Sequence, residues 1–245
     1  MSEPRSEQLL QVNAVTKTFG GLHAVFQVSF HIAPGEIIGL IGPNGAGKTT
    51  LFNVISGFYA PSKGHIHFKG QDISGKPPYK LAVLGIGRTF QVVKPFAGLT
   101  VLENVIIASF AKHPKRRQAE QHAWRILETT GLADRANAQA SSLTLAGRKR
   151  LEVSKALALE PTLLLLDEVV AGLNPTEADK TIELILSLRS QGITILIVEH
   201  IMRVIMNISD RVVVLNFGQK IAEGIPRDVA KDSGVIQAYL GEAPQ

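Results

Sequence analysis

Nine consecutive residues, Gly42 to Thr50, have the types and spacing needed to hold a phosphate group. They read Gly-Pro-Asn-Gly-Ala-Gly-Lys-Thr-Thr and fit the pattern Gly-x4-Gly-Lys-Ser/Thr. The apolar run Ile37 to Ile41 before them is typical of a strand buried on both faces, and a helix is expected after them. Glycine lets several backbone N–H groups converge on an anion that also faces the helix N-terminus. The segment therefore predicts a phosphate-binding loop.

The side chains of this loop have distinct expected roles. Lys48 would neutralise charge on the β- and γ-phosphates of a bound nucleotide. The Thr49 hydroxyl suits Mg²⁺, and the Thr50 hydroxyl suits an α-phosphate oxygen. The other loop residues expected to contact the nucleotide are Asn44, Gly45, Ala46 and Gly47. The plainer alternative is a Gly-rich turn before an ordinary helix, and the complete spacing argues against it.

Two adjacent acids end a second apolar run. The run Thr162 to Leu166 has the composition of a strand, and Asp167 and Glu168 follow it directly. Ligands bind at the carboxyl ends of parallel strands, so these acids are expected at a functional edge of the sheet. Asp167 then suits the Mg²⁺ shell, and Glu168 suits a general base that polarises the water attacking the γ-phosphate. A solvent-facing acidic turn is the alternative, which the phosphate loop disfavours.

Strands and helices alternate after these acids. Residues 193–198 and 211–215 are strand-like apolar runs, and a helix is expected between the first of them and the acids. That helix has the residues of a well-formed start and end: Asn174 as N-cap, Pro175, Glu177 and Gly192. Such βαβ alternation predicts a parallel sheet and an α/β fold.

Two other segments have different patterns. Apolar and polar residues alternate from Phe26 to Ile32, which predicts an antiparallel strand with one solvated face and His31 pointing to solvent. His65 and His67 flank Ile66 in a similar alternation, so none of these histidines is expected to bind a metal. Between about 99 and 159 the periodicity is helical, including 101–111 and 151–159. This stretch predicts a helical insert.

Composition excludes several classes of protein. The 45% apolar content is enough for a core, and no apolar run approaches the ~18 residues that a membrane-spanning helix needs. The polar N-terminus lacks a signal-peptide pattern, and the absence of cysteine rules out disulfides and thiolate metal sites. The 26 basic residues are interspersed with 21 acidic ones, and the dense run Lys112 to Arg117 is expected to be a solvated connection. No nucleic-acid partner is expected.

Further residues, in order along the chain, make the sequence resemble ABC-transporter ATPases. Phe19 stands where that family places an aromatic ring against adenine, and Val25 matches a second base contact. Gln91, which ends Gly87-Arg88-Thr89-Phe90-Gln91, matches the glutamine that reaches Mg²⁺ and the attacking water. His200 matches the histidine that touches the γ-phosphate. The resemblance covers nearly the whole chain and implies ATP hydrolysis.

The segment Leu143 to Gly147 aligns with the family signature Leu-Ser-Gly-Gly-Gln. Thr144 keeps a hydroxyl, and with Ala146 and Gly147 it is expected to complete the ATP site of the opposite subunit in a dimer. Leu145 and Ala146 stand where the signature has glycine. They cannot take glycine-only backbone angles freely, so this departure could affect the segment. A second departure, Asn174 in place of Asp, keeps the ability to cap a helix.

The resemblance also implies the domain organisation and the partners. It implies a P-loop NTPase with a RecA-like parallel-sheet core and an antiparallel β subdomain, formed by 1–91 and 158–245, and an α-helical subdomain inserted at 92–157. A second ATPase subunit and integral membrane permease subunits are the implied partners. The expected location is cytoplasmic, peripheral on the inner face of the cell membrane. Docking on a permease is expected through the helical subdomain, with a seat near Val92, Val93, Pro95 and Phe96.

Motif wording narrows the subgroup. Residues 85–91, 95–105 and 171–175 look most like the importers of branched-chain amino acids. Importers of amides or urea and the ATPase of lipopolysaccharide export remain alternatives within the family. Outside transport, the alternatives are a soluble ABC ATPase acting on nucleic acid and a P-loop kinase. The transported solute itself passes through other subunits and cannot be read from this chain.

Overall fold

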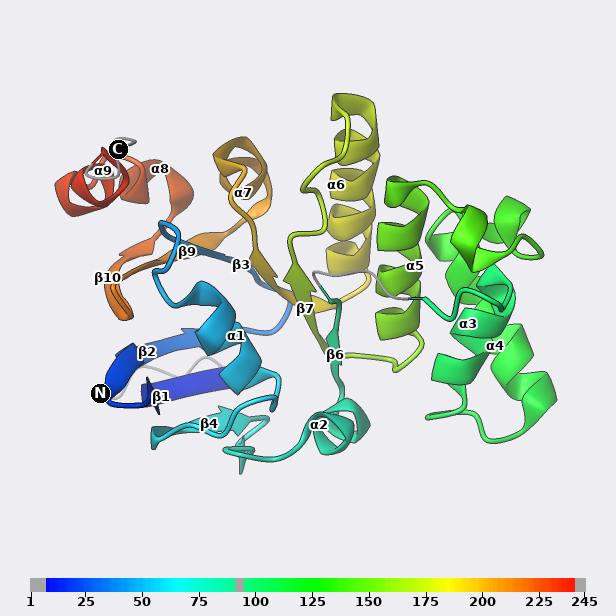
Figure 1. The fold of residues 1–245 in the computed structure, drawn as a ribbon, viewed down its shortest axis with the longest axis horizontal. Helices are drawn as coiled ribbons and strands as arrows, with labels where there is room; N and C mark the ends of the chain where they lie inside the picture. Colours follow the sequence, from blue (N-terminus) through cyan, green and yellow to red (C-terminus); the bar gives the residue numbers. More distant parts are fainter. Residues whose placement is uncertain (1–7, 91–94, 241–245) are drawn as a thin grey trace, which may run out of the picture. The chain divides into compact units, whose positions relative to one another are not determined.

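The protein is described by a computed structural model that covers residues 8–90 and 95–240. The chain divides into two compact units, each of which is described by itself. The first unit comprises Met1–Leu81 and Thr194–Gln245, and the second comprises Ala82–Ile193. Helix α2 (Pro78–Leu84) crosses the boundary between them. Figure 1 gives the labels of the elements.

An antiparallel sheet forms one part of the first unit. Its order is β2-β1-β4-β5. The strands are β1 (Leu10–Phe19), β2 (Leu22–Ile32), β4 (Lys63–Phe68) and β5 (Gln71–Asp72). Within β2, Val28, Phe30 and Ile32 are buried and Gln27 and Ser29 are exposed, which confirms the antiparallel strand predicted from its alternation. His31, expected to point at solvent, is half-buried.

The same unit contains a set of strands with the order β10-β9-β3-β8. These are β3 (Ile37–Ile41), β8 (Thr194–Val198), β9 (Arg211–Asn216) and β10 (Gln219–Gly224). β3 runs parallel to both β8 and β9, and every residue of β3 and β8 is buried, as their unbroken apolar sequences predict. The helices of this part are α1 (Lys48–Ile55), α7 (Met202–Ile208), α8 (Pro226–Val229) and α9 (Ser233–Leu240).

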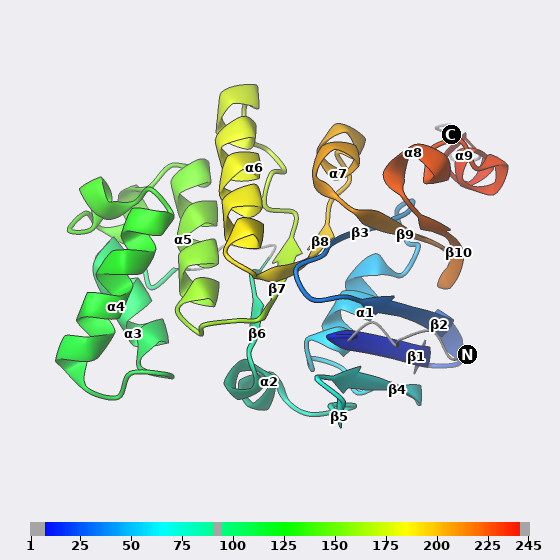
Figure 2. The same ribbon diagram turned by 180° about the vertical axis from the view of Figure 1, so that it is seen from behind.

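The second unit combines two parallel strands with a cluster of helices. The strands are β6 (Ile86–Arg88) and β7 (Leu163–Asp167). The helices are α3 (Val101–Ser109), α4 (Arg116–Thr129), α5 (Leu145–Leu157) and α6 (Pro175–Ser190), with 3₁₀ turns η1 (Ala133–Arg135) and η2 (Ala140–Ser142). Helices α3, α4 and α5 pack together, as Figures 1 and 2 both show. Helical residues therefore dominate this unit, as the sequence predicts.

Most expected elements are present, and their boundaries differ in places. The helix expected over 151–159 begins earlier, at Leu145, and the one expected over 101–111 ends at Ser109. The expected helical subdomain 92–157 lies inside the second unit, whose limits are different, so that subdomain division stays a prediction. Within residues 8–90 and 95–240, no helix is long and apolar enough to cross a membrane.

Candidate active site

The loop between β3 and α1 adopts a backbone that only glycine tolerates at two positions. Gly47 has φ +98°, and a Cβ there would lie 2.4 Å from the carbonyl oxygen of Ala24. Gly42 has φ +149°, and a Cβ there would lie 2.1 Å from the carbonyl oxygen of Leu215. Gly45 also has a positive φ, of +75°, yet it faces open space. Close approach of neighbouring strands therefore fixes the ends of the loop and leaves its middle free for a ligand.

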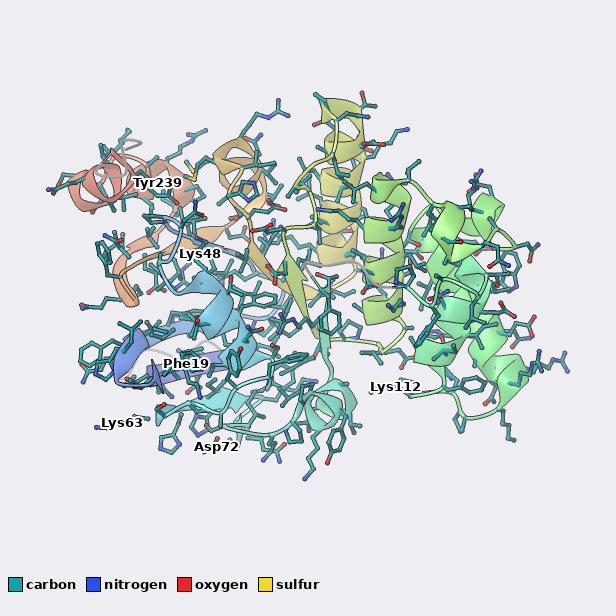
Figure 3. All side chains as sticks on the ribbon, viewed as in Figure 1. Phe19, Lys48, Lys63, Asp72, Lys112 and Tyr239 are labelled. Atoms are coloured by element: carbon teal, nitrogen blue, oxygen red, sulfur yellow. The ribbon has the colours of Figure 1, made fainter. Side chains whose placement is uncertain are left out.

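Lys48 reaches back across this loop from the first residue of α1. Its Nζ donates hydrogen bonds to the carbonyl oxygens of Gly42 at 2.6 Å and Pro43 at 2.7 Å. Figure 3 labels this lysine at the start of the helix. The loop thus combines an ammonium group, a helix N-terminus and open space over Gly45, which together fit a phosphate group. The other residues predicted to contact the nucleotide lie in the same loop segment. Asn44 and Thr49 are exposed, Thr50 is half-buried and Ala46 is buried.

The predicted base-contacting residues behave differently from each other. Phe19 is 43% exposed at the end of β1, and its ring and that of Tyr59 pack in a T-shaped arrangement with centroids 5.2 Å apart. Lys17 places its Nζ 5.0 Å from the centre of the Phe19 ring. Phe19 therefore has a free aromatic surface that suits a purine. Val25 is fully buried, so its contact with a base stays a prediction.

His200 is exposed just after β8, in the first unit with the phosphate loop. The residue before it, Glu199, is buried. Gln91 lies outside the described residues, as do Val92 and Val93. Roles for Gln91 and His200 in hydrolysis therefore stay predictions.

Asp167 is a buried carboxylate at the carboxyl end of β7. It is 4% exposed, and its Oδ2 lies 3.6 Å from Nη2 of Arg88. The Thr89 hydroxyl accepts a hydrogen bond from the Asp167 backbone N–H at 3.0 Å. Burial raises the pKa of Asp167, and the nearby Arg88 guanidinium opposes that rise. Burial also lowers the pKa of Arg88, and the Asp167 carboxylate opposes that decrease. A cation placed here would relieve the cost of burying this carboxylate.

Glu168 follows in a strained backbone conformation. Its φ of +49° is uncommon for a residue with a side chain and is a sign of a functional constraint. Lys149, on α5, donates hydrogen bonds from its Nζ to the carbonyl oxygens of Glu168 and Ala171. A cavity of about 10 Å³ is lined by the following side chains: Thr89, Phe90, Lys149, Glu152, Asp167, Glu168 and Val169. That space is of the order of one water molecule.

The signature segment forms the capped start of α5. Thr144 is the N-cap, and its hydroxyl accepts a hydrogen bond from the Gly147 N–H at 3.2 Å. Leu145 and Ala146 lie inside the helix, and neither has a positive φ. The concern that they would need glycine-only angles is therefore removed. Thr144, Ala146 and Gly147 do come together, at a helix N-terminus that suits an anion.

The two units thus hold different parts of the predicted site. The first unit contains the phosphate loop with Lys48, and also Phe19, Val25 and His200. The second contains the acidic pair and the signature residues. Sequence reasoning missed Arg88, Lys149 and Tyr59. Arg88 ends a strand beside β7, and that position at a sheet edge was the available signal.

Comparison with known families identifies the class of protein. The family described as "ABC transporter" matches residues 25–171. A second family, described as "Branched-chain amino acid ATP-binding cassette transporter", matches residues 219–244. The high-affinity branched-chain amino acid transport ATP-binding protein LivG of Escherichia coli K12 is 43% identical, covering 97% of this chain and all of the relative. BraF of Pseudomonas aeruginosa, with the same description, is 40% identical over 97% of this chain and all of that relative.

Solved structures agree with this assignment. The ATP-binding cassette MJ1267 in its ADP conformation has a TM-score of 0.88 and 33% identity, over 96% of this chain and 99% of that one. A dimeric post-hydrolysis state of the cassette MJ0796, bound to ADP and Pi, has a TM-score of 0.80 and 25% identity, over 89% of this chain and 99% of that one. The α/β P-loop fold is therefore confirmed. This chain belongs to the family of ATP-binding subunits of ABC transporters.

Proposed function

We propose that this chain hydrolyses ATP at the residues described above and energises an importer of branched-chain amino acids. The phosphate loop Gly42 to Thr50 carries the proposal, because its glycine geometry and the Lys48 ammonium form a ready anion site. Family membership supplies ATP with Mg²⁺ as the ligands. The relatives named for branched-chain amino acid transport, and the family match at 219–244, support the solute class.

Binding of ATP would use both the loop and the exposed aromatic ring. The exposed face of Phe19 suits adenine stacking, and Lys48 would exchange the carbonyl oxygens it now contacts for phosphate oxygens. Mg²⁺, when bound, supplies charge neutralisation on the β- and γ-phosphate oxygens. The groups proposed to hold it are the Thr49 hydroxyl, the Gln91 amide and the Asp167 carboxylate.

Hydrolysis would depend on Glu168 as general base. Its carboxylate follows the buried Asp167 and lines the small cavity, so it could orient one water molecule. Lys149 would position this base indirectly, by binding the Glu168 carbonyl and so fixing the strained backbone. His200 is proposed to contact the γ-phosphate.

The phosphate loop is tested by Lys48→Ala. Loss of the ammonium leaves phosphate charge uncompensated, so nucleotide binding or hydrolysis should fall by about tenfold or more, about 1.4 kcal/mol. Lys63→Ala removes a lysine of β4 from the same unit and is the matched control, expected to behave as wild type. Wild-type turnover in Lys48→Ala would refute the assignment of the loop.

A dimer is proposed because the N-terminus of α5, which Thr144 caps, suits an anion that a second copy could supply. Thr144 and the first-turn N–H groups of α5 are expected to complete the ATP site of a second copy. The cassette MJ0796 bound to ADP and Pi is dimeric, which supports this proposal. Specific ATPase activity should then fall on dilution. Mixing wild type with a Thr144→Lys, Glu168→Gln double variant should give sub-additive rates. Activity strictly proportional to chain concentration throughout would contradict the shared site.

Docking on a membrane permease is proposed through the surface that includes Phe96. This ring is 53% exposed, although its backbone is tightly held. Buried Asn104 accepts a hydrogen bond from the Phe96 N–H at 2.9 Å and donates one to the Phe96 carbonyl oxygen at 3.2 Å. A rigid backbone that presents an apolar ring to solvent is typical of an interaction site. The protein would therefore lie on the cytoplasmic face of the membrane.

Phe96→Asp separates docking from catalysis. An exposed ring can be replaced without loss of the core, so ATPase activity of the isolated subunit should survive. Retention on membranes that carry the permease subunits should fall. Loss of both ATPase activity and membrane retention would show that Phe96 stabilises the fold. Loss of neither would place the interface elsewhere. Uptake of labelled leucine, valine and amides by the reconstituted transporter distinguishes the proposed solute class from its alternatives.

A further inference from the structure

Two histidines and a glutamate meet in the second unit, away from the acidic pair. His113 lies between α3 and α4, His122 lies on α4, and Glu160 lies between α5 and β7. Within residues 8–90 and 95–240, this is the one group of three metal-ligating residue types whose donor atoms all lie within 4.8 Å of one another. Lys112, which Figure 3 labels, marks the neighbouring position before His113. Neither the family assignment nor the proposed ATPase mechanism uses these residues.

The donor atoms have spacings close to those of a metal site. His113 Nε2 is 2.9 Å from Glu160 Oε1, and His122 Nε2 is 3.9 Å from the same oxygen. The two imidazole rings are 4.5 Å apart between centroids. Ligand atoms around a tetrahedral zinc ion are separated by about 3.3 Å, given bond lengths near 2.0 Å. Side-chain rotations that move each donor atom by less than about 1 Å would therefore bring all three donors within bonding distance of one ion.

His122 supplies a nitrogen that its protein environment leaves unsatisfied. Its Nε2 is buried and makes no hydrogen bond with any residue that the structure describes. A neutral imidazole can offer the lone pair of such an unpaired nitrogen to a metal ion.

Glu160 is held in place by an uncommon backbone conformation. Its φ is +50°, and its N–H donates to the Leu157 carbonyl oxygen at 2.9 Å at the end of α5. Strained positions of this kind are associated with functional sites, where the surrounding structure enforces them. The carboxylate thereby faces both imidazoles from a different element of the chain.

We propose that His113, His122 and Glu160 bind a divalent transition-metal ion of the zinc class, with water completing the coordination. Ions of the zinc class bind imidazole nitrogen as well as carboxylate oxygen, whereas Mg²⁺ selects oxygen ligands. Two imidazole nitrogens and one carboxylate oxygen therefore favour a zinc-class ion. The ion would join the α3–α4 connection and α4 to the segment that leads from α5 into β7. Because β7 ends at Asp167, a bound metal would stiffen the approach to the acidic pair.

A second histidine pair provides a matched control. His65 and His67 lie on β4, with ring centroids 6.3 Å apart, and His65 Nδ1 is 3.1 Å from Asp72 Oδ2. This set also has two imidazoles and a carboxylate. It is not among the groups whose donors converge, however. The proposal therefore predicts different behaviour for two sets that share the same kinds of donor group.

The test is Co²⁺ and Zn²⁺ binding by the full, tag-free protein without nucleotide. Excess Mg²⁺ is present to occupy oxygen-donor sites. Co²⁺ should give visible d–d absorption typical of nitrogen and oxygen ligands, displaced by one equivalent of Zn²⁺ per chain. His122→Gln and, separately, Glu160→Gln should each weaken binding by about tenfold or more, since each removes one ligand. The His65→Gln, His67→Gln double variant should bind as wild type.

Thermal unfolding gives a second readout. Zn²⁺ should raise the Tm of wild type and of the His65, His67 double variant, because a ligand that binds only the folded state stabilises it. At the same Zn²⁺ concentration it should raise the Tm of Glu160→Gln by less, because the weakened site binds less metal. Glu160 is more exposed than His122, so misfolding is a lesser concern in this variant. Absence of one-equivalent Co²⁺ binding to wild type would overturn the proposal. So would equal affinity in wild type and both site variants, or loss of binding in the His65, His67 variant alone.

Discussion

Replacement of Gly47 by alanine tests the construction of the phosphate loop. A methyl group here would lie 2.4 Å from the carbonyl oxygen of Ala24, which belongs to β2, and 3.3 Å from the Cα of Gly218. The backbone must also keep a φ of +98°. The left-handed conformation costs about 1–2 kcal/mol for a residue with a Cβ, and overpacking against backbone adds about 1–3 kcal/mol. We expect Gly47→Ala to lower the free energy of unfolding by about 2–5 kcal/mol.

Gly45→Ala is the control with the same chemistry and no collision. Its φ is +75°, but no atom of the described part of the chain lies within 4 Å of the added methyl group. Only the backbone cost of about 1–2 kcal/mol applies to folding. The methyl group would instead enter the open space assigned to the phosphates, so nucleotide affinity should fall in a protein that remains folded.

Urea unfolding followed by circular dichroism and titration with a fluorescent ATP analogue measure the two quantities. Gly47→Ala should be the less stable variant by about 1–3 kcal/mol, the overpacking contribution alone. Gly45→Ala should lose only the backbone cost of about 1–2 kcal/mol and bind nucleotide more weakly. Equal destabilisation of the two variants would refute the reasoning, because it would mean that the Ala24 carbonyl does not constrain Gly47.

Three further predictions follow from particular contacts. Lys149→Met should reduce kcat by about tenfold with little change in KM for ATP. The substitution releases the Glu168 backbone without touching the phosphate loop, and an unchanged kcat in steady-state assays would contradict this positioning role. Asn174→Ala should lower the free energy of unfolding by about 1 kcal/mol, because it removes one half of the capping box with Glu177, and denaturant unfolding would show no change if the cap contributes nothing. Hydrogen bonds from Ser74 lower the pKa of Asp72 below its ordinary 3.8. The ionised carboxylate therefore stabilises the fold above that pH, and this stabilisation is lost as the pH falls. Ser74→Ala should shift the titration of this carboxyl upward when it is followed by NMR, and an unchanged titration would contradict the hydrogen-bond cause.

The sequence predicts the parts of the fold that have strong local signals. β3 and β8 are fully buried apolar runs, and α6 begins with the predicted capping box of Asn174 and Glu177. The start of α5 was harder to locate. Its first turns carry Arg148, Lys149 and Arg150, which hide the apolar periodicity, so the helix was expected only from Leu151. The Thr144 cap is the signal that places its true beginning.

Residues that act through tertiary contacts could not be found in this way. Lys149 meets the Glu168 carbonyl and Arg88 meets Asp167 only because separate elements fold together. The same holds for His113, His122 and Glu160, whose sequence separations match no local metal-binding pattern. Motif spacing identified the phosphate loop and the acidic pair, because there the chemistry lies within a few consecutive residues.

The central claim is that this chain hydrolyses ATP with Glu168 as the general base. Its most direct test is phosphate release from ATP and Mg²⁺, with no other phosphate acceptor present, by wild type and by Glu168→Gln. The amide keeps the shape of the side chain and leaves Asp167 intact, but it is a poor proton acceptor. Wild type should release phosphate, and Glu168→Gln should bind ATP with similar affinity, form a dimer on gel filtration and release almost none. Hydrolysis by Glu168→Gln at the wild-type rate, or the absence of phosphate release by wild type without an acceptor, would contradict the account.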